Sequence, residues 1–379
     1  MAVQELPKTR LDEFVPGRTR RFRVKARSRV IGGTFSLINA LTRYDMEGRE
    51  NLIDAVSRAR ASGRGLLTVS NHLSLFDDPM VQCAVLGLRN VTVETKCWWS
   101  TACASNFDPH EPGLRSKVVR MFSEASNMVF FARAYKGCKA SGASRSLAET
   151  LRPRLGWKRF EALERRAAEL GTDVEGMLRG WKTAREGEEP TSLDQLGIIE
   201  SCARLAVGDW LQFFPEGGRS RSLSLRPARP GVGKVIYHSP GVEVVPICFY
   251  GTQDVLPIGA VVPRPFKRVV VRVGRPIGAA VLDQFRAEPP TPRTFLRVAE
   301  FAMAGVGALR PEVLARYMGA EAAAKLIEEE QAEMALATAQ GAKVPSDRPT
   351  VPPPPLPADA LWACTTDERP TDGFSERAG

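Results

Sequence analysis

The segment LLTVSNHLSLFDDPM contains the side chains of this chain that are best suited to moving a proton. His72 follows an apolar run, and the carboxyl groups of Asp77 and Asp78 come shortly after it. A carboxylate that holds one imidazole nitrogen fixes the tautomer and favours the imidazolium, and the other nitrogen is then free to act as a general base. His72 and Asp77 are two thirds of a hydrolase triad without a protein nucleophile. We therefore expect the substrate to supply its own hydroxyl.

The spacing of His72 and Asp77 restricts the local structure. Five residues of α-helix rotate a side chain by about 500°, which leaves the two side chains about 140° apart. In a strand, an odd separation sends them to opposite faces. They can meet only across a strand-to-helix turn, and we expect the strand to end at Asn71 and the helix to begin around Ser74.

A second segment, WLQFFPEGGRSRS, has the composition of a phosphate-binding loop. An apolar strand is stopped by Pro215, and Glu216, Gly217, Gly218 and Arg219 follow. Glycines admit the close approach of a ligand to the backbone, and arginine presents a planar fork to phosphate oxygens. Taken alone, the segment is better explained as a glycine-rich turn with solvated arginines.

The sequence lacks the motifs of several other kinds of functional site. The seven cysteines include no C-x-x-C pair, and neither H-E-x-x-H nor G-x-S-x-G occurs. RPGVGKV does not have the spacing of a nucleotide-binding P-loop. We expect no metal site and no bound cofactor.

The hydrophobic pattern predicts an α/β domain from about residue 64 to 275, because short β-rich runs alternate with longer helical ones. Residues 141–205 have helical periodicity and are interpreted as a helical insertion, and a further helical segment covers 293–339. Residues 341–379 are rich in proline and are expected to be a disordered tail. The predicted strands are Leu66–Val69, Val91–Thr95, Met128–Phe131, Trp210–Phe214, Glu243–Phe249 and Arg268–Val273.

The N-terminal region is strongly basic within a chain of net charge +10. Arg18–Arg29 carries seven cations and no acid, and Ile31, Phe35, Ile38 and Leu41 then recur at helical spacing. This pattern suits a helix lying in an anionic membrane interface. A solvated arm before a core helix, or a nucleic-acid patch, has the same composition. No apolar run is long enough to span a bilayer and no secretory signal pattern opens the chain, which leads us to expect a cytoplasmic location.

Together these segments resemble the four motif blocks of the glycerolipid acyltransferase family. NHLSLFD is similar to the first block, NMVFFARA with Arg133 to the second, FPEGGRS to the third and EVVPICF to the fourth. Asp77-Asp78 followed by proline, GVGK and GTQDVLP are most similar to the tafazzin branch. The resemblance covers about residues 20–275. It departs at the 141–205 stretch and at Ala132, where many relatives that use acyl-CoA have an acidic residue.

The resemblance implies a layered α/β sheet flanked by helices, and direct transfer of an acyl chain to a lysophospholipid hydroxyl. His72 would be the general base and Asp77 its orienting partner, while Arg133 and Arg219 would hold the acceptor phosphate and Glu216 would order the loop or touch the glycerol. The remaining residues assigned to substrate binding are Asn71, Asp78, Gly217 and Gly218.

The resulting domain organisation is a basic arm with a membrane-interface helix (1–45), an acyltransferase domain (46–340) and the tail. The acyl donor is expected to be a phospholipid, as in tafazzin-like exchange, with acyl-CoA or acyl carrier protein as the alternative of 1-acylglycerol-3-phosphate acyltransferases. The expected partners are membrane phospholipids and lysophospholipids, met by peripheral or monotopic association at the cytoplasmic face, and not nucleic acid. The alternative from another class is a basic membrane-binding protein without catalysis.

Overall fold

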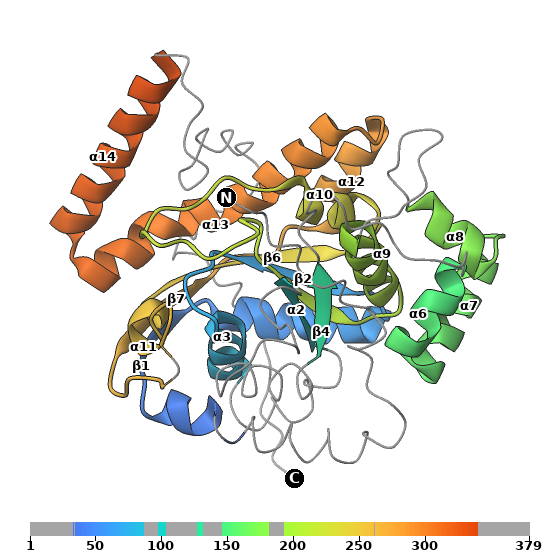
Figure 1. The fold of residues 1–379 in the computed structure, drawn as a ribbon, viewed down its shortest axis with the longest axis horizontal. Helices are drawn as coiled ribbons and strands as arrows, with labels where there is room; N and C mark the ends of the chain where they lie inside the picture. Colours follow the sequence, from blue (N-terminus) through green and yellow to red (C-terminus); the bar gives the residue numbers. More distant parts are fainter. Residues whose placement is uncertain are drawn as a thin grey trace, which may run out of the picture.

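A seven-stranded mixed sheet forms the centre of the protein (Figure 1). The computed structural model describes residues 33, 35–86, 98–103, 127–131, 146–181, 193–260 and 262–339. The strand order is β1-β7-β6-β2-β5-β3-β4, and every neighbouring pair is parallel except β6 and β7. The strands are β1 (Arg43–Glu47), β2 (Leu66–Ser70), β3 (Trp98–Cys103), β4 (Met128–Phe131), β5 (Trp210–Phe213), β6 (Glu243–Tyr250) and β7 (Arg268–Val273).

Helices cover both faces of this sheet, because the central strands are apolar at successive positions. On β2, Leu67 belongs to one apolar core with helices on one face of the sheet, whereas its neighbour Leu66 belongs to a second core with helices on the other face. Strands buried on both sides have such continuous apolar sequences. The helices are α2 (Arg49–Ser62), α3 (Asp77–Leu86), α6 (Leu147–Leu155), α7 (Trp157–Glu169), α8 (Val174–Gly180), α9 (Leu193–Ala206), α10 (Pro230–Tyr237), α11 (Thr252–Val255), α12 (Ala279–Asp283), α13 (Pro292–Met318) and α14 (Ala320–Ala339), with a 3₁₀ turn at Gln284–Ala287.

The predicted α/β class is confirmed, and five of the predicted strands are present as β2, β4, β5, β6 and β7. The predicted strand Val91–Thr95 lies outside the described residues. Two strands, β1 and β3, were not predicted. β1 has the sequence RYDME, whose charged residues hide it from a search for apolar runs. Its Asp45 pairs with Arg268 of β7, so an edge position accommodates these charges.

Helices α6, α7 and α8 form a compact body with an apolar core of their own, which includes Phe160, Leu163 and Leu178 and continues onto α9. This body lies at the β4 side of the sheet in Figure 1. The helical character predicted for this part of the chain is confirmed within residues 146–181 and 193–206.

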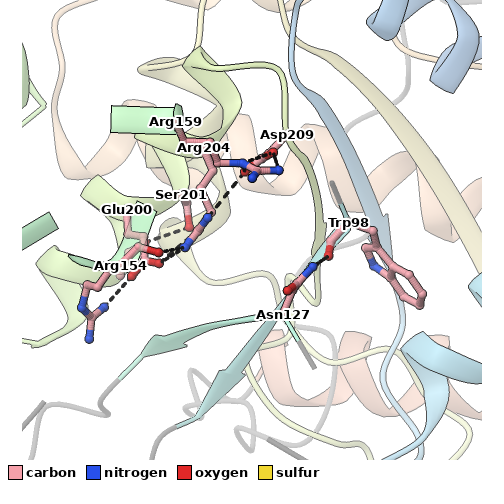
Figure 2. A network of polar contacts seen from close by, with 9 residues as sticks. Trp98, Asn127, Arg154, Arg159, Glu200, Ser201, Arg204 and Asp209 are labelled. Atoms are coloured by element: carbon pink, nitrogen blue, oxygen red, sulfur yellow. Dashed lines mark hydrogen bonds and ion pairs between the residues drawn. The ribbon is translucent and has the colours of Figure 1, made fainter. Parts of the chain in front are cut away.

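A buried ionic network attaches this body to the sheet (Figure 2). Arg204 of α9 lies between Glu200 and Asp209, at 2.6 and 3.5 Å, and its guanidinium stacks over the Trp99 ring of β3. From the helical body, Arg154 reaches Glu200 and Arg159 reaches Asp209, the latter at 2.6 Å. Because Asp209 immediately precedes β5, the network connects α6 and α7 to a central strand.

The short helix at residues 35–40 corrects one expectation. Phe35 is 4% exposed and its ring meets Phe76 edge-on, and Ile38 packs against the same core. These two side chains are covered by the protein itself, so they are not the face that a bilayer would cover. Instead, Leu37 is exposed, as is Leu41 just beyond the helix. No helix among the described residues is both long and apolar enough to cross a membrane.

The predicted domain limits at residues 45 and 340 stay predictions. Residues 1–32 and 340–379, which include the basic arm and the proline-rich tail, lie outside the described part of the chain.

Candidate functional site

His72 lies in the turn that connects β2 to α3, as the spacing requires. β2 ends at Ser70 and α3 begins at Asp77, three residues later than expected. The reason is local: Asp77 Oδ2 accepts hydrogen bonds from the backbone N–H groups of Leu73 and Ser74, at 2.6 and 2.8 Å. The carboxylate at the first turn of the helix thus satisfies backbone donors of the turn and delays the helix.

The same carboxylate oxygen holds the imidazole. His72 Nδ1 lies 2.8 Å from Asp77 Oδ2, which gives Nδ1 the role of donor and leaves Nε2 with a lone pair. The Asp77 side chain is fully buried, whereas that of His72 is 18% exposed. The imidazole also stacks on the ring of Phe214, with centroids 4.0 Å apart and planes 19° from parallel. Asp77 therefore holds the edge of the imidazole ring and Phe214 packs on its face, while the ring remains accessible to solvent.

Phe214 was not singled out by sequence reasoning. It directly precedes Pro215 and Glu216, so the doubled phenylalanine of FFPEGG was the available signal.

The Pro-Glu-Gly-Gly-Arg loop binds the backbone of His72 on both sides. Glu216 Oε1 accepts from the His72 N–H at 2.8 Å, and the His72 carbonyl accepts from the Ser220 N–H at 2.7 Å. Glu216 Oε2 accepts from the Arg226 N–H at 2.9 Å. The two segments found separately in the sequence are thus one structural unit. Both Glu216 oxygens are used to order the loop, the first of the two roles expected for it.

Burial raises the pKa of Glu216 to about 8, and the nearby charge of Asp77 acts in the same direction. The hydrogen bonds from the Arg226 and His72 backbones oppose this rise only partly.

Gly217 requires its small size. Its φ is 65°, and a Cβ there would lie 2.5 Å from the Arg229 side chain. Gly218 and Arg219 follow, each partly exposed. The Arg219 carbonyl accepts from Arg226 Nη1 at 3.3 Å, so the loop folds back on itself. Its arginines come to the same edge of the sheet as His72.

Asn71 and Asp78, both assigned to substrate binding from the sequence, make structural contacts. The Asn71 amide donates to the Phe249 carbonyl and accepts from its N–H, at 2.7 and 3.0 Å, which joins the turn to β6. Asp78 accepts from Ser100 of β3. Burial, and then the charge of Asp77, raise the pKa of Asp78 well above its ordinary value. The contacts of Asn71 and Asp78 thus hold the turn that carries His72 against β6 and β3.

Arg133 lies outside the described residues, so its predicted role in phosphate binding stays a prediction. Among the residues that the structure describes, no cluster of histidine, cysteine and acidic side chains is suited to hold a metal ion.

A second set of contacts, which no motif indicated, stabilises the loop from the C-terminal helices. Arg310 of α13 donates to the Leu223 carbonyl at 3.2 Å, to the Tyr250 hydroxyl at 2.9 Å, and to both carboxylate oxygens of Glu330 at 2.7 Å. Glu330 of α14 also accepts from Ser224. The nearest signal in the sequence was a charged residue within the apolar face of a long helix.

Comparison with known proteins finds matches to acyltransferases. The sequence model of a family described as Acyltransferase matches residues 183–250, which include the Glu216 loop and β6 but not His72. A tafazzin of Drosophila melanogaster is 24% identical over 272 residues, which are 69% of this chain and 53% of the relative. A protein of Dictyostelium discoideum named taffazin is 24% identical over 255 residues, 64% of this chain and 67% of that protein. The chain thus matches about half the length of the first relative and two thirds of the second.

Proposed function

We propose that the chain, which the comparisons place near the tafazzin branch of the glycerolipid acyltransferase family, transfers a fatty acyl chain directly to a free glycerol hydroxyl of a lysophospholipid. The observation that carries the proposal is the 2.8 Å contact between His72 Nδ1 and Asp77 Oδ2 in an accessible turn. Binding a lipid or a phosphate needs no oriented general base. A solvent-accessible imidazole whose second nitrogen is held by a buried carboxylate is suited to take a proton from a hydroxyl.

The reaction follows from this arrangement. His72 Nε2 takes the proton of the acceptor hydroxyl, and the resulting oxygen nucleophile forms a bond to the acyl carbonyl carbon of the donor. The intermediate collapses by breaking the original ester bond, and the leaving oxygen receives the proton from the imidazolium. Asp77 remains a carboxylate throughout and stabilises the imidazolium. The acyl group passes from oxygen to oxygen without an acyl-enzyme.

The acceptor phosphate is proposed to bind at the glycine-arginine loop, through Arg219 together with Arg133. Gly217 and Gly218 permit the close approach of the ligand, and the contacts of Glu216 keep the loop against the turn that carries His72. Charge-assisted contacts of arginine with phosphate contribute about 1.5–3 kcal/mol each. Asn71 and Asp78 are then proposed to affect substrate binding indirectly, by holding the turn that carries His72 in place.

The proposed donor is a second phospholipid, so that the protein exchanges acyl chains between two bilayer lipids. Both curated relatives bear the tafazzin name, which supports this choice. Exchange between similar oxygen esters is nearly balanced in free energy and requires only a lowered barrier. No cofactor takes part. The site works where its substrates lie, at a membrane surface, and the cytoplasmic face is proposed for it.

The test supplies the purified full chain with vesicles that contain lysophospholipid and a phospholipid labelled in its acyl chain, with no thioester present. Label should appear in the acceptor, and His72→Ala should remove the transfer while the melting temperature stays close to that of the wild type. Transfer that requires acyl-CoA or acyl carrier protein would overturn the proposed phospholipid donor, but the proposal that the protein is an acyltransferase would stand. No transfer with any donor would favour a binding protein without catalysis.

A further inference from the structure

Five of the nine most exposed large apolar side chains in the described part of the chain belong to two short segments. We call them the apolar loop patch: Leu37, Leu41, Ile258, Val262 and Phe266. Val262 and Phe266 are 75% and 65% exposed. Single exposed apolar residues are common on soluble proteins, but a group of them on one surface marks an interaction site.

Backbone contacts bring the two segments together. The Phe266 N–H donates to the Leu41 carbonyl at 2.7 Å, and the Arg43 N–H donates to the Lys267 carbonyl at 2.9 Å. The loop after α11 is closed at its base by a hydrogen bond from Arg264 to Val255, also at 2.7 Å. Ile258 and Val262 lie between those two closing residues, at the exposed end of the loop.

The patch is attached to the turn that carries His72. Ser74 Oγ donates to the Leu256 carbonyl, where the loop begins, at 2.9 Å. The Asn39 amide donates to the carbonyl of Met80 in α3 at 3.1 Å. In Figure 1, α11 and β1 lie on the same side of the molecule as α3. Whatever binds the patch is therefore held beside the proposed site.

Within the two segments themselves, the charges have one sign. Residues 35–43 and 256–268 contain Arg43, Arg264, Lys267 and Arg268 and no acidic residue, and all four cations are exposed. Arg268 shares a salt bridge with Asp45, which leaves the other three as the basic border. Apolar side chains surrounded by cations complement an anionic bilayer, because the former enter the acyl boundary and the latter meet the headgroups.

The backbone at Phe266 gives an independent indication. Its φ is 61°, and within the described residues no other non-glycine residue has a positive φ. A bulky aromatic residue in this region is strained, and such strain persists where function requires the side chain. Pro263 and Pro265, on either side of Arg264, restrict the other conformations of this segment.

We propose that the apolar loop patch docks on an anionic lipid bilayer and so brings the turn that carries His72 to the membrane surface. None of its residues belongs to the cationic stretch Arg18–Arg29, and it does not include Phe35 and Ile38, which pack on the core. The docking does not depend on the proposed chemistry. It rests on exposure, charge and backbone geometry, and it is measured without turnover.

The central variant is Phe266→Asn in the full chain, because asparagine tolerates a left-handed backbone better than phenylalanine does. The variant should therefore be at least as stable as the wild type, which separates loss of binding from loss of folding. Its partition onto vesicles of phosphatidylcholine with anionic phosphatidylglycerol, measured by flotation, should fall about tenfold, equivalent to about 1.4 kcal/mol. Lys267→Glu should weaken binding to these vesicles and have little effect with phosphatidylcholine alone.

The matched control is Trp157→Asn, which removes an equally exposed aromatic side chain, 69% exposed, from α7. It should bind vesicles as the wild type does. Equal losses for the two variants, or a change of less than twofold for Phe266→Asn, would overturn the proposal. A change in oligomeric state for Phe266→Asn, measured by light scattering, would identify the patch as an interface between copies of the chain and would also overturn it.

A further experiment tests the docking separately from the proposed function. His72→Ala should bind vesicles like the wild type, so docking can be confirmed even if no acyl transfer is found. Conversely, Phe266→Asn should lose transfer on vesicles and retain it with short-chain lipids dispersed in detergent. Equal loss in both assays would show that Phe266 acts within the site instead of on the membrane.

Discussion

His72 is oriented by three contacts from different parts of the chain: Asp77 at the ring edge, Phe214 at the ring face, and the Glu216 loop at the backbone. Each contact restricts a different degree of freedom. The carboxylate fixes the tautomer, the aromatic ring limits rotation, and the loop fixes the position of the Cα atom. A general base held in this way loses little entropy when the substrate binds.

The first prediction concerns Asp77→Asn. The amide oxygen can still accept the hydrogen bonds from Leu73 and Ser74, but the charge that stabilises the imidazolium is lost. Acyl transfer should fall by about 10²- to 10⁴-fold, the usual contribution of general acid–base catalysis. The melting temperature should change much less than the rate. Retention of more than about a tenth of the activity would contradict the role of the carboxylate.

The second prediction uses the raised pKa of Glu216, about 8 compared with an ordinary value of 4.5. Because the folded state binds this proton more tightly than the unfolded state, the stabilisation is complete below about 4.5 and is lost as the pH rises through about 8. Glu216→Gln cannot titrate. The melting temperature of the wild type minus that of the variant should therefore decrease as the pH rises across this window.

Thermal unfolding of both proteins at a series of pH values measures that difference. A difference that stays constant or grows with pH would mean that the carboxyl is ionised in the folded protein. It would then accept both backbone N–H groups as a carboxylate.

At the scale of elements, two groups of helices act on the site from outside it. Arg310 of α13 and Glu330 of α14 stabilise the loop after Arg219 through Leu223 and Ser224. The ionic network of Arg204 attaches the body formed by α6, α7 and α8 to the start of β5.

The third prediction is that Glu330→Ala weakens the use of the acceptor. It leaves the buried Arg310 without its carboxylate, and the loss of one partner of a buried pair costs about 3–5 kcal/mol. The KM for lysophospholipid should rise more than kcat falls, because the variant disturbs the loop that carries Arg219 and leaves Asp77 in place. Glu328→Ala, which removes an exposed acid of the same helix, is the control. A fall confined to kcat would show that α14 does not affect binding of the acceptor.

The fourth prediction compares two changes in the network of Figure 2. Arg204→Met leaves the pairs Arg154–Glu200 and Arg159–Asp209 balanced, whereas Glu200→Gln leaves Arg154 without its carboxylate and Arg204 with Asp209 alone. Denaturant unfolding should show a loss of about 3–5 kcal/mol for Glu200→Gln and a smaller loss for Arg204→Met. The reverse order would mean that stacking on Trp99 contributes more than charge balance.

At the scale of the whole molecule, we expect the net charge of +10 and the apolar loop patch to act together on an anionic surface. The charges attract over about a Debye length, and the patch contributes at contact.

The fifth prediction follows from this division. Deleting residues 1–29, with the seven cations of Arg18–Arg29, should weaken binding to anionic vesicles at low salt and make the remaining binding less sensitive to salt. Vesicle flotation over a range of salt concentrations measures both effects. Unchanged binding at low salt would show that the basic arm takes no part.

The sequence alone was sufficient for the α/β class, for five strands and for the turn that carries His72 and Asp77, because these depend on local periodicity and on the reach of neighbouring side chains. It also identified the Glu216 loop, because Pro215 restricts the backbone and the glycines after it permit a tight turn. Only the tertiary structure decided which partners these residues have. Phe214 against His72, Asn71 against Phe249, and Glu330 with Arg310 against the loop are contacts between segments far apart in the chain. The same holds for Phe35 and Ile38, whose helical spacing cannot tell a protein core from a bilayer, since both are apolar environments.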